Sequence, residues 1–228
     1  MLPSFSLPIA STIVAATIIG AADIQMAFRI SFKFLLLCPL VLVAAPADSA
    51  PRPVPRELSC TGPFAREATY AGMVKAFGRN NVKTESVGIG EGEMARATVI
   101  FARDKARRIE IFWRDAKKRR GLAEMRISTG STWRTTQGVA VGMPLVDVEA
   151  INGRPFLLAG FGWDYGGTTL DWKDGKLATQ PGGCRLMLRF DQQKPTDADI
   201  DGDREFSSDD KGMRSAAPIV EEISFRFE

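Results

Sequence analysis

Apolar residues in the second half of the chain recur at close to every second position between Phe156 and Tyr165. This spacing is expected for a strand with one buried face, while Gly160 and Gly162 within it predict a bulge. Gly166-Gly167 is a turn signal, and residues 168–172 predict the returning strand. The pattern therefore predicts a small sheet that gathers the aromatic residues Phe156, Phe161, Trp163, Tyr165 and Trp172.

Three- and four-residue spacing of apolar positions predicts two short helices, each ended by a glycine. The first spans residues 61–78, with Thr61 as its cap and Gly78 as its stop. The second follows Gly142-Met143-Pro144 and places Leu145, Val148 and Ile151 on one face. Asn152-Gly153 supplies residues tolerant of positive φ at its end, and Pro155 prevents the helix from resuming.

Alternating patterns predict further strands at 82–87, 97–103, 107–114, 122–128, 184–190 and 219–227. The glycine-spaced segment 88–93 is interpreted as a loop, and residues 191–212, acidic and poor in apolar residues, as a long loop or a disordered segment. Short helices beside many short strands predict an α+β fold in which the helices pack on an antiparallel sheet.

The same pattern suggests an order of segments along the chain. Residues 1–47 are interpreted as a signal peptide, 48–60 as a flexible lead-in, 61–130 as a first αβ unit and 131–190 as a second. Residues 191–228 are the acidic loop and the C-terminal strand. Because Gly78 and Gly153 end similar helices 75 residues apart, two tandem αβ units related by an internal duplication are one interpretation.

The signal-peptide interpretation depends on the segment that begins at Met26. Basic Arg29 and Lys33 precede an apolar run, 34–45, and Ala45-Pro46-Ala47 fits the small-x-small cleavage pattern. Either translation starts at Met26 or the signal is unusually long. The rival interpretation is a membrane anchor, for which the run is short, and Cys38 follows three leucines rather than the small residue of a lipoprotein signal. We expect a periplasmic or secreted protein with no stable transmembrane helix after signal removal.

The cysteine and histidine content limits the kinds of catalytic and metal site that this chain can form. Signal removal leaves Cys60 and Cys184, and in an oxidising compartment an even pair predicts a disulfide. The alternative, a reactive thiol, needs an activating base, and the chain contains no histidine. The missing histidine also excludes serine–histidine and cysteine–histidine nucleophiles and histidine-ligated zinc. No cofactor is expected.

The charges of the chain nearly balance, with 30 lysines and arginines against 27 aspartates and glutamates. The basic residues are scattered apart from the segment Arg114 to Arg120, so we expect no nucleic-acid partner. That basic segment has two interpretations. In the first, the segment contacts anionic lipid or lipopolysaccharide. In the second, it is a charged hairpin connection that protects strand edges from pairing.

Three groups of side chains are candidates for function. Phe161, Trp163, Tyr165 and Trp172 are predicted to contact a partner, the alternative being packing of the sheet against the helices. Alternating carboxylates resemble the first half of a calcium loop whose twelfth-position glutamate is missing, which makes them a weak calcium candidate: Asp197, Asp199, Asp201 and Asp203. Asp164 and Asp171 are a candidate carboxylate pair for glycoside hydrolysis.

Two short motifs carry a resemblance to known families. The segments Gly142-Met-Pro-Leu-Val-Asp-Val148 and Gly153-Arg-Pro155 resemble the helix and glycine–proline turn of SmpA/BamE-type and beta-lactamase-inhibitor-like folds. That resemblance implies a helix packed on a small antiparallel sheet. The chain lacks the lipoprotein cysteine of the BamE family, so an outer-membrane assembly role is not carried over. The motifs CTGPF, FGRNNV and GFGWDYGG resemble an uncharacterised family of secreted proteobacterial proteins, which implies no activity.

Together these features predict a non-enzymatic periplasmic protein that binds an unknown protein or an envelope ligand through its aromatic side chains. The alternative is a carboxylate-based hydrolase that acts on glycans of the cell envelope.

Overall fold

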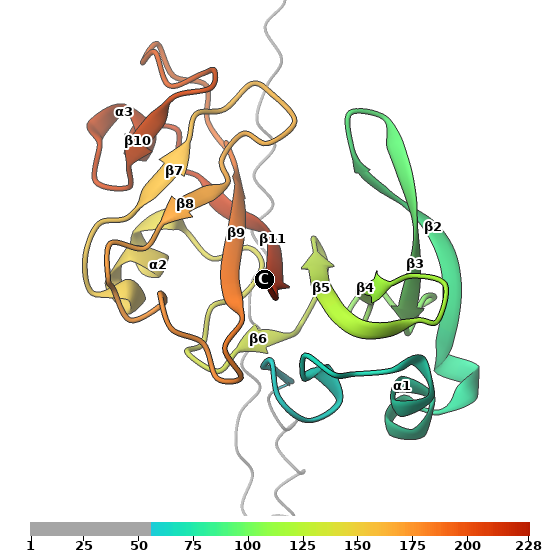
Figure 1. The fold of residues 1–228 in the computed structure, drawn as a ribbon. Coiled ribbons are helices and arrows are strands. Elements are labelled where there is room, and N and C mark those ends of the chain that lie inside the picture. The colour runs from blue at the N-terminus through green and yellow to red at the C-terminus, as the bar shows by residue number, and fades with distance from the viewer. Residues whose placement is uncertain (1–55) are drawn as a thin grey trace, which may run out of the picture. The chain divides into compact units, whose positions relative to one another are not determined.

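The computed structural model describes residues 56–228, so the predicted signal peptide and most of the lead-in lie outside the described residues (Figure 1). Its helices are short and its sheets are mostly antiparallel, which confirms the predicted α+β class. No helix within residues 56–228 is long and apolar enough to cross a membrane. The lead-in was predicted to be flexible as far as residue 60, yet Glu57–Leu58 forms strand β1 and Leu58 is buried.

The largest element is a six-stranded antiparallel sheet with the order β2-β3-β4-β5-β11-β9 (Figure 1). Its strands are β2 Val82–Gly90, β3 Glu93–Ile100, β4 Ile109–Asp115, β5 Arg120–Ser128, β11 Ile219–Arg226 and β9 Arg185–Asp191. The last strand in the sequence, β11, therefore lies between β5 and β9. Strands from the predicted first unit, the second unit and the C-terminal segment share one sheet.

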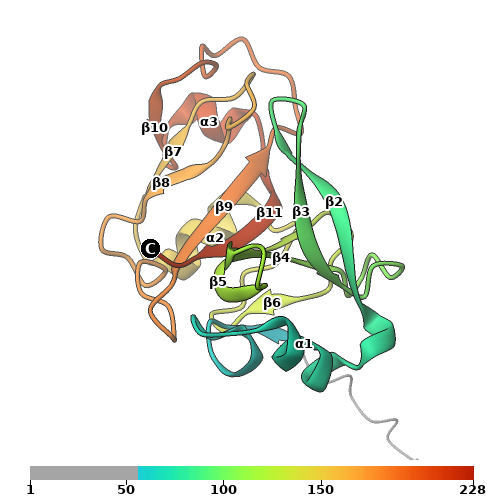
Figure 2. The same cartoon turned by 45° about the vertical axis from the view of Figure 1, so that its right-hand side comes forward.

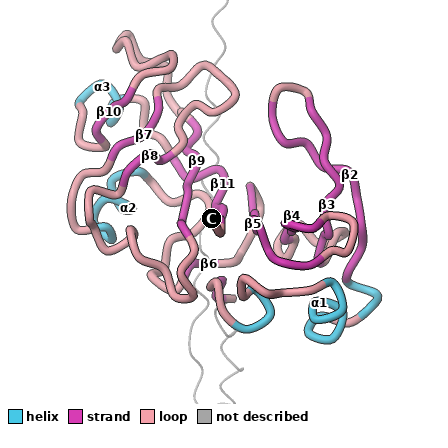
Figure 3. The backbone as a smooth tube through the Cα atoms, viewed as in Figure 1, coloured by secondary structure: helices cyan, strands magenta, loops and turns pink. Residues whose placement is uncertain are grey.

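Strands β2 and β3 form a long hairpin arm (Figure 3). The predicted loop at 88–93 is wrong, because β2 continues through a bulge to Gly90 and β3 begins at Glu93. Only Glu91 and Gly92 form the turn, and both have positive φ, 52° and 74°. The glycines therefore serve a tight hairpin turn and not an irregular loop.

Two smaller sheets complete the strand structure. Strand β7, Leu157–Ala159, lies between β10, Glu205–Ser207, and β8, Thr169–Asp171, and all three are antiparallel neighbours. Strand β1 pairs in parallel with β6, Arg134–Thr135. The β8 side of the small sheet meets the edge of β9, where the N–H of Phe190 donates to the carbonyl of Gly167 at 3.0 Å.

The prediction of a loop or disordered segment at 191–212 is wrong over its second half. Strand β10 lies within it, and helix α3, Lys211–Ser215, begins before it ends. Ile200 and Met213 are buried in the core, and Asp210 caps α3 by accepting from the N–H of Met213 at 3.0 Å. A few well-placed apolar side chains order this segment although its average composition is polar.

Of the two predicted helices, the second is confirmed and the first is divided into two shorter elements. Helix α2, Leu145–Asn152, begins after Pro144 and ends at Gly153 with φ 80°, as predicted. The first predicted helix, 61–78, is broken into a 3₁₀ turn, Gly62–Phe64, and helix α1, Tyr70–Phe77. Thr69 caps α1, with its hydroxyl accepting from the N–H of Gly72 at 3.1 Å, and Gly78 ends it as expected.

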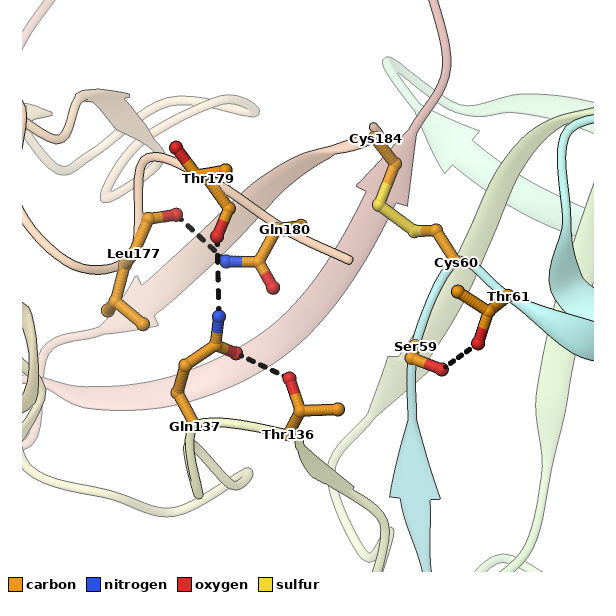
Figure 4. The surroundings of a disulfide bond; sticks show 9 residues. All are labelled: Ser59, Cys60, Thr61, Thr136, Gln137, Leu177, Thr179, Gln180 and Cys184. Carbon is orange, nitrogen blue, oxygen red and sulfur yellow. Dashed lines mark hydrogen bonds between the residues drawn. A yellow bond between two sulfur atoms is a disulfide. The ribbon is translucent and has the colours of Figure 1, made fainter. Parts of the chain in front are cut away.

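The predicted disulfide is present between Cys60 and Cys184, whose Cα atoms lie 6.1 Å apart (Figure 4). Both cysteines are buried. Gly182, two residues before Cys184, packs so closely against Cys60 that a Cβ atom on Gly182 would lie 2.0 Å from the carbonyl oxygen of Cys60. The bond ties the first described segment to the start of β9, as the sequence predicts.

Candidate functional site

A polar cleft of about 450 Å³ lies on the face of the large sheet that points away from the main core. Strands β4, β5, β9 and β11 form its floor, and its rim comes from the tip of the β2–β3 hairpin and from the β7–β8 loop, residues 160–168. Figure 2 shows that loop beside the tip of the hairpin. Its charged lining residues are Glu110, Arg126, Asp164, Arg189, Glu221, Glu222 and Arg226.

Strand alternation explains why this face is charged. On β4, Ile109, Ile111 and Trp113 are buried in the main core, so Glu110 points to the opposite face. The register then places Arg126 of β5 directly opposite Glu110 and also opposite Ser224 of β11. Residues far apart in the sequence therefore form one row across the sheet.

The floor is crossed by a chain of alternating acidic and basic side chains. Arg108 contacts Glu85 at 3.1 Å and Glu110 at 3.0 Å. Arg126 continues the chain, with its Nη2 atom 2.6 Å from Glu110 and its Nε atom 3.6 Å from Glu222. We call the following seven residues the charge ladder: Glu85, Arg108, Glu110, Arg126, Glu222, Arg189 and Glu221.

The centre of the ladder is shielded from water. The side chains of Arg126, Glu110 and Glu222 are 15%, 16% and 18% exposed. Burial raises the pKa of Glu222, and the cations of Arg126 and Arg189 oppose that rise. Burial lowers the pKa of Arg126, but the carboxylates of Glu222 and Glu110 outweigh it and the net direction is upward.

The ladder satisfies its own hydrogen-bonding groups. Arg126 also donates to the carbonyl of Gly88 at 2.8 Å, which links the floor to the hairpin arm. No buried side-chain nitrogen or oxygen in residues 56–228 lacks a hydrogen-bond partner. The floor is therefore stable without a ligand, and a ligand would contact it at its exposed edges.

The rim, in contrast, exposes large apolar side chains. Five such side chains are exposed within residues 56–228, and four of them belong to the two segments that meet at this rim. We call these four the apolar rim: Ile89, Met94, Trp163 and Tyr165. The fifth, Val146, lies on α2. Met94 is 61% exposed and Tyr165 is 48% exposed, so both side chains are accessible from solvent.

Specific contacts hold the two halves of the rim together. The N–H of Glu91 at the hairpin tip donates to Asp164 Oδ2 at 2.9 Å. Trp163 and Tyr165 pack edge to face with ring centroids 5.4 Å apart, and the Trp163 indole N–H donates to the carbonyl of Gly160 at 3.0 Å. Trp163 and Tyr165 are therefore held in place before any partner arrives.

The structure separates the four aromatic residues that the sequence groups together. Trp163 and Tyr165 are exposed, but Phe161 and Trp172 are each only 6% exposed and belong to the core. The Trp172 indole N–H donates to the carbonyl of Leu186 at 2.9 Å, and its ring lies 4.9 Å from that of Phe156. A partner cannot reach Phe161 or Trp172, so their assignment to the binding face is wrong.

The aromatic residues separate where strand β7 ends. The strand ends at Ala159, and the next residue, Gly160, packs so closely against Gly202 that a Cβ atom on Gly160 would lie 2.6 Å from the Gly202 carbonyl oxygen. The segment that follows is a looped turn in which the two-residue period no longer holds. Phe161 turns into the core, and the next two aromatic residues turn outward.

The other candidate residues are not gathered into a site. No group of three or more metal-ligating side chains forms in the described part of the chain. In the weak calcium candidate, Arg204 binds the Asp199 carboxylate, with Nη1 3.0 Å from Oδ2. Asp164 lines the cleft, whereas Asp171 does not. The backbone N–H of Lys173 lowers the pKa of Asp171, which is opposite to the shift that a general acid needs.

Sequence reasoning missed half of the apolar rim and the whole charge ladder. The alternation of Glu110 with buried isoleucines is a usable signal for a charged face, but the partners of Arg126 are identified only by the sheet order. Comparison of the chain with protein-family models, with curated proteins and with solved structures found no match. The geometry of the cleft and its rim is therefore the basis for any functional conclusion.

Proposed function

We propose that this chain is a binding protein that recognises a protein partner through its apolar rim, with the charged cleft beside the rim as a selectivity element. The observation that carries the proposal is that four of the five exposed large apolar side chains within residues 56–228, Ile89, Met94, Trp163 and Tyr165, belong to the two segments joined at the rim, and that Ile89 and Tyr165 line the cleft itself. Aromatic and methionine side chains are enriched at the centres of protein interfaces.

The order of the rim supports this function. Binding costs free energy when side chains must become ordered, and that cost is smaller where they are already fixed. Asp164 joins the two segments through the Glu91 N–H, and Trp163 is held by its bond to Gly160. Trp163 and Tyr165 are therefore ordered aromatic anchors of the kind that dominate binding energies.

The charge ladder supplies the selectivity. Its members Arg189 and Glu221, with the neighbouring Arg226 and Asp164, offer both signs of charge within the lining of the cleft. A partner segment with an apolar anchor and flanking charges of both signs would complement this surface. A partner with one sign of charge only would meet repulsion from half of these groups.

We further propose that the protein acts in the periplasm or outside the cell. The disulfide fits an oxidising compartment, and the signal-peptide pattern before residue 48 predicts export.

The test compares partner capture by matched variants of the full chain. Proteins captured from an envelope extract are purified, and each is titrated against the wild type, Trp163→Ala/Tyr165→Ala and Val146→Ala. We expect the double variant to weaken binding at least about thirtyfold, since an aromatic anchor contributes about 2 kcal/mol or more. Val146→Ala should leave the affinity unchanged. Equal affinities for the double variant and the wild type would reject the rim as the binding surface.

One observation favours a second candidate, a carboxylate-based hydrolase of envelope glycans. Burial raises the pKa of Glu222 inside the cleft, the direction that a general acid requires. Under this hypothesis Glu222→Gln abolishes cleavage of a glycan library, while Asp171→Asn outside the cleft does not. Absence of cleavage by the wild type would remove the candidate.

A further inference from the structure

A second pocket, of about 500 Å³, lies beside the turn between β4 and β5, and no carboxylate lines it. Three cations do, Arg96 from β3 and Lys117 and Arg119 from the turn. It shares no lining residue with the cleft. This pocket therefore has its own electrostatic character and needs its own explanation.

The pocket is held by specific contacts. The Trp113 indole N–H donates to the buried Thr98 hydroxyl at 2.8 Å, and both side chains line the pocket. The guanidinium of Arg119 lies over the Tyr70 ring, 3.7 Å from its centroid, and its backbone carbonyl accepts from the Tyr70 N–H at 2.9 Å. Arg119 is thus fixed at the wall of the pocket by α1.

The three cations lack the partners that their neighbours have. Within the described residues, none of Arg96, Lys117 and Arg119 lies within 4.0 Å of a carboxylate oxygen, the limit for an ion pair. In the same turn, Lys118 and Arg120 both pair with Asp115, at 3.8 and 3.7 Å. Like charges that line one pocket without counter-charge repel each other, and a bound anion removes that repulsion.

We propose that this pocket binds an anionic ligand of the phosphate class. Arg96 and Arg119 supply planar N–H donors suited to phosphate oxygens, Lys117 supplies a point charge, and the Thr84 hydroxyl supplies a further donor at the wall. The phosphate belongs either to a small molecule or to a lipid headgroup. This site is independent of the proposed protein-binding rim.

The test uses the full chain and two probes. Inorganic phosphate is titrated while backbone amide chemical shifts are recorded, at low and at high sodium chloride. Vesicles of phosphatidylglycerol, with phosphatidylcholine vesicles as the neutral comparison, are tested by co-sedimentation. The test variant is Arg96→Gln/Lys117→Gln. The matched control is Arg103→Gln/Lys105→Gln, which removes the same charge from the exposed β3–β4 turn.

We expect the test variant to weaken binding at least about tenfold, because it removes two charge-assisted contacts, while the control variant binds like the wild type. Binding of inorganic phosphate with this pattern identifies a small-molecule phosphate site. Capture by phosphatidylglycerol vesicles alone, with the same pattern, identifies a headgroup site. The proposal is overturned if neither probe binds, or if both double variants lose binding equally.

Discussion

Removal of the Cys60–Cys184 disulfide gives the best-defined change in stability. The cysteines are 124 positions apart, so the bond closes a loop that spans most of the described chain. For a loop of this length, the chain-entropy relation gives about 5 kcal/mol at 25 °C. We therefore expect Cys60→Ala/Cys184→Ala to lose about 5 kcal/mol of unfolding free energy, plus a smaller cost for the vacated space.

Urea denaturation of the wild type and of the variant, each with and without reductant, measures this loss. Reductant should lower the unfolding free energy of the wild type to near that of the variant, and it should leave the variant unchanged. The midpoint of thermal unfolding should fall by about 10 to 20 °C for a domain of this size. A loss of less than about 1 kcal/mol would refute the reasoning, because the closed loop would then not constrain the unfolded chain.

Three further predictions follow from the cleft and the glycines. Burial raises the pKa of Glu222, so the stability that its bound proton provides at low pH is lost as the pH rises through that pKa. Chemical denaturation between about pH 4 and 8 should therefore show Glu222→Gln gaining stability relative to the wild type as the pH rises. The control variant Glu221→Gln should show a smaller change. Arg126→Met leaves buried carboxylates without their cation and should cost about 3 to 5 kcal/mol in the same assay, against less than about 0.5 for the exposed Arg103→Met. Gly182→Ala should lower the thermal midpoint more than Gly183→Ala, because both glycines have positive φ but only Gly182 abuts Cys60; equal losses would contradict the contact.

The sequence predicted elements whose signals are local. The sequence predicts helix α2 with its end at Gly153, because the spacing of its buried apolar residues and the glycine that takes a positive φ both lie within one short segment. Strand β11 was predicted at 219–227 and is found at Ile219–Arg226. The disulfide was predicted because the segment after the signal contains only two cysteines.

The errors arise where distant segments determine the local structure. Gly160 packs against the carbonyl of Gly202 just after β7 ends at Ala159, and the next residue, Phe161, is buried in the core. The polar composition of residues 191–212 predicts a loop, yet β10 in this segment pairs with β7 and Ile200 is buried. Neither contact is visible from periodicity, because each depends on a partner more than 40 positions away.

The candidate site was predicted only in part for the same reason. The sequence predicts Trp163 and Tyr165 as partner contacts because such side chains bury a large area at little entropic cost, and both are exposed as a partner surface requires. Met94 lies on the hairpin that meets their loop, and the sequence does not indicate it, because the glycine-spaced hairpin tip predicts a loop. The charge ladder depends on β11 lying between β5 and β9, which is a property of the topology.

The most direct test of the central claim is site-specific photo-crosslinking from the surface of the full chain in its own cells. A photo-reactive residue is placed at position 163, at position 94 or, as the control, at position 146 on α2, all three being exposed in the structure. We predict one shared crosslinked partner from positions 163 and 94 and none from position 146. A partner crosslinked equally from all three positions, or none from 163 and 94, would contradict the assignment of the apolar rim as a binding surface.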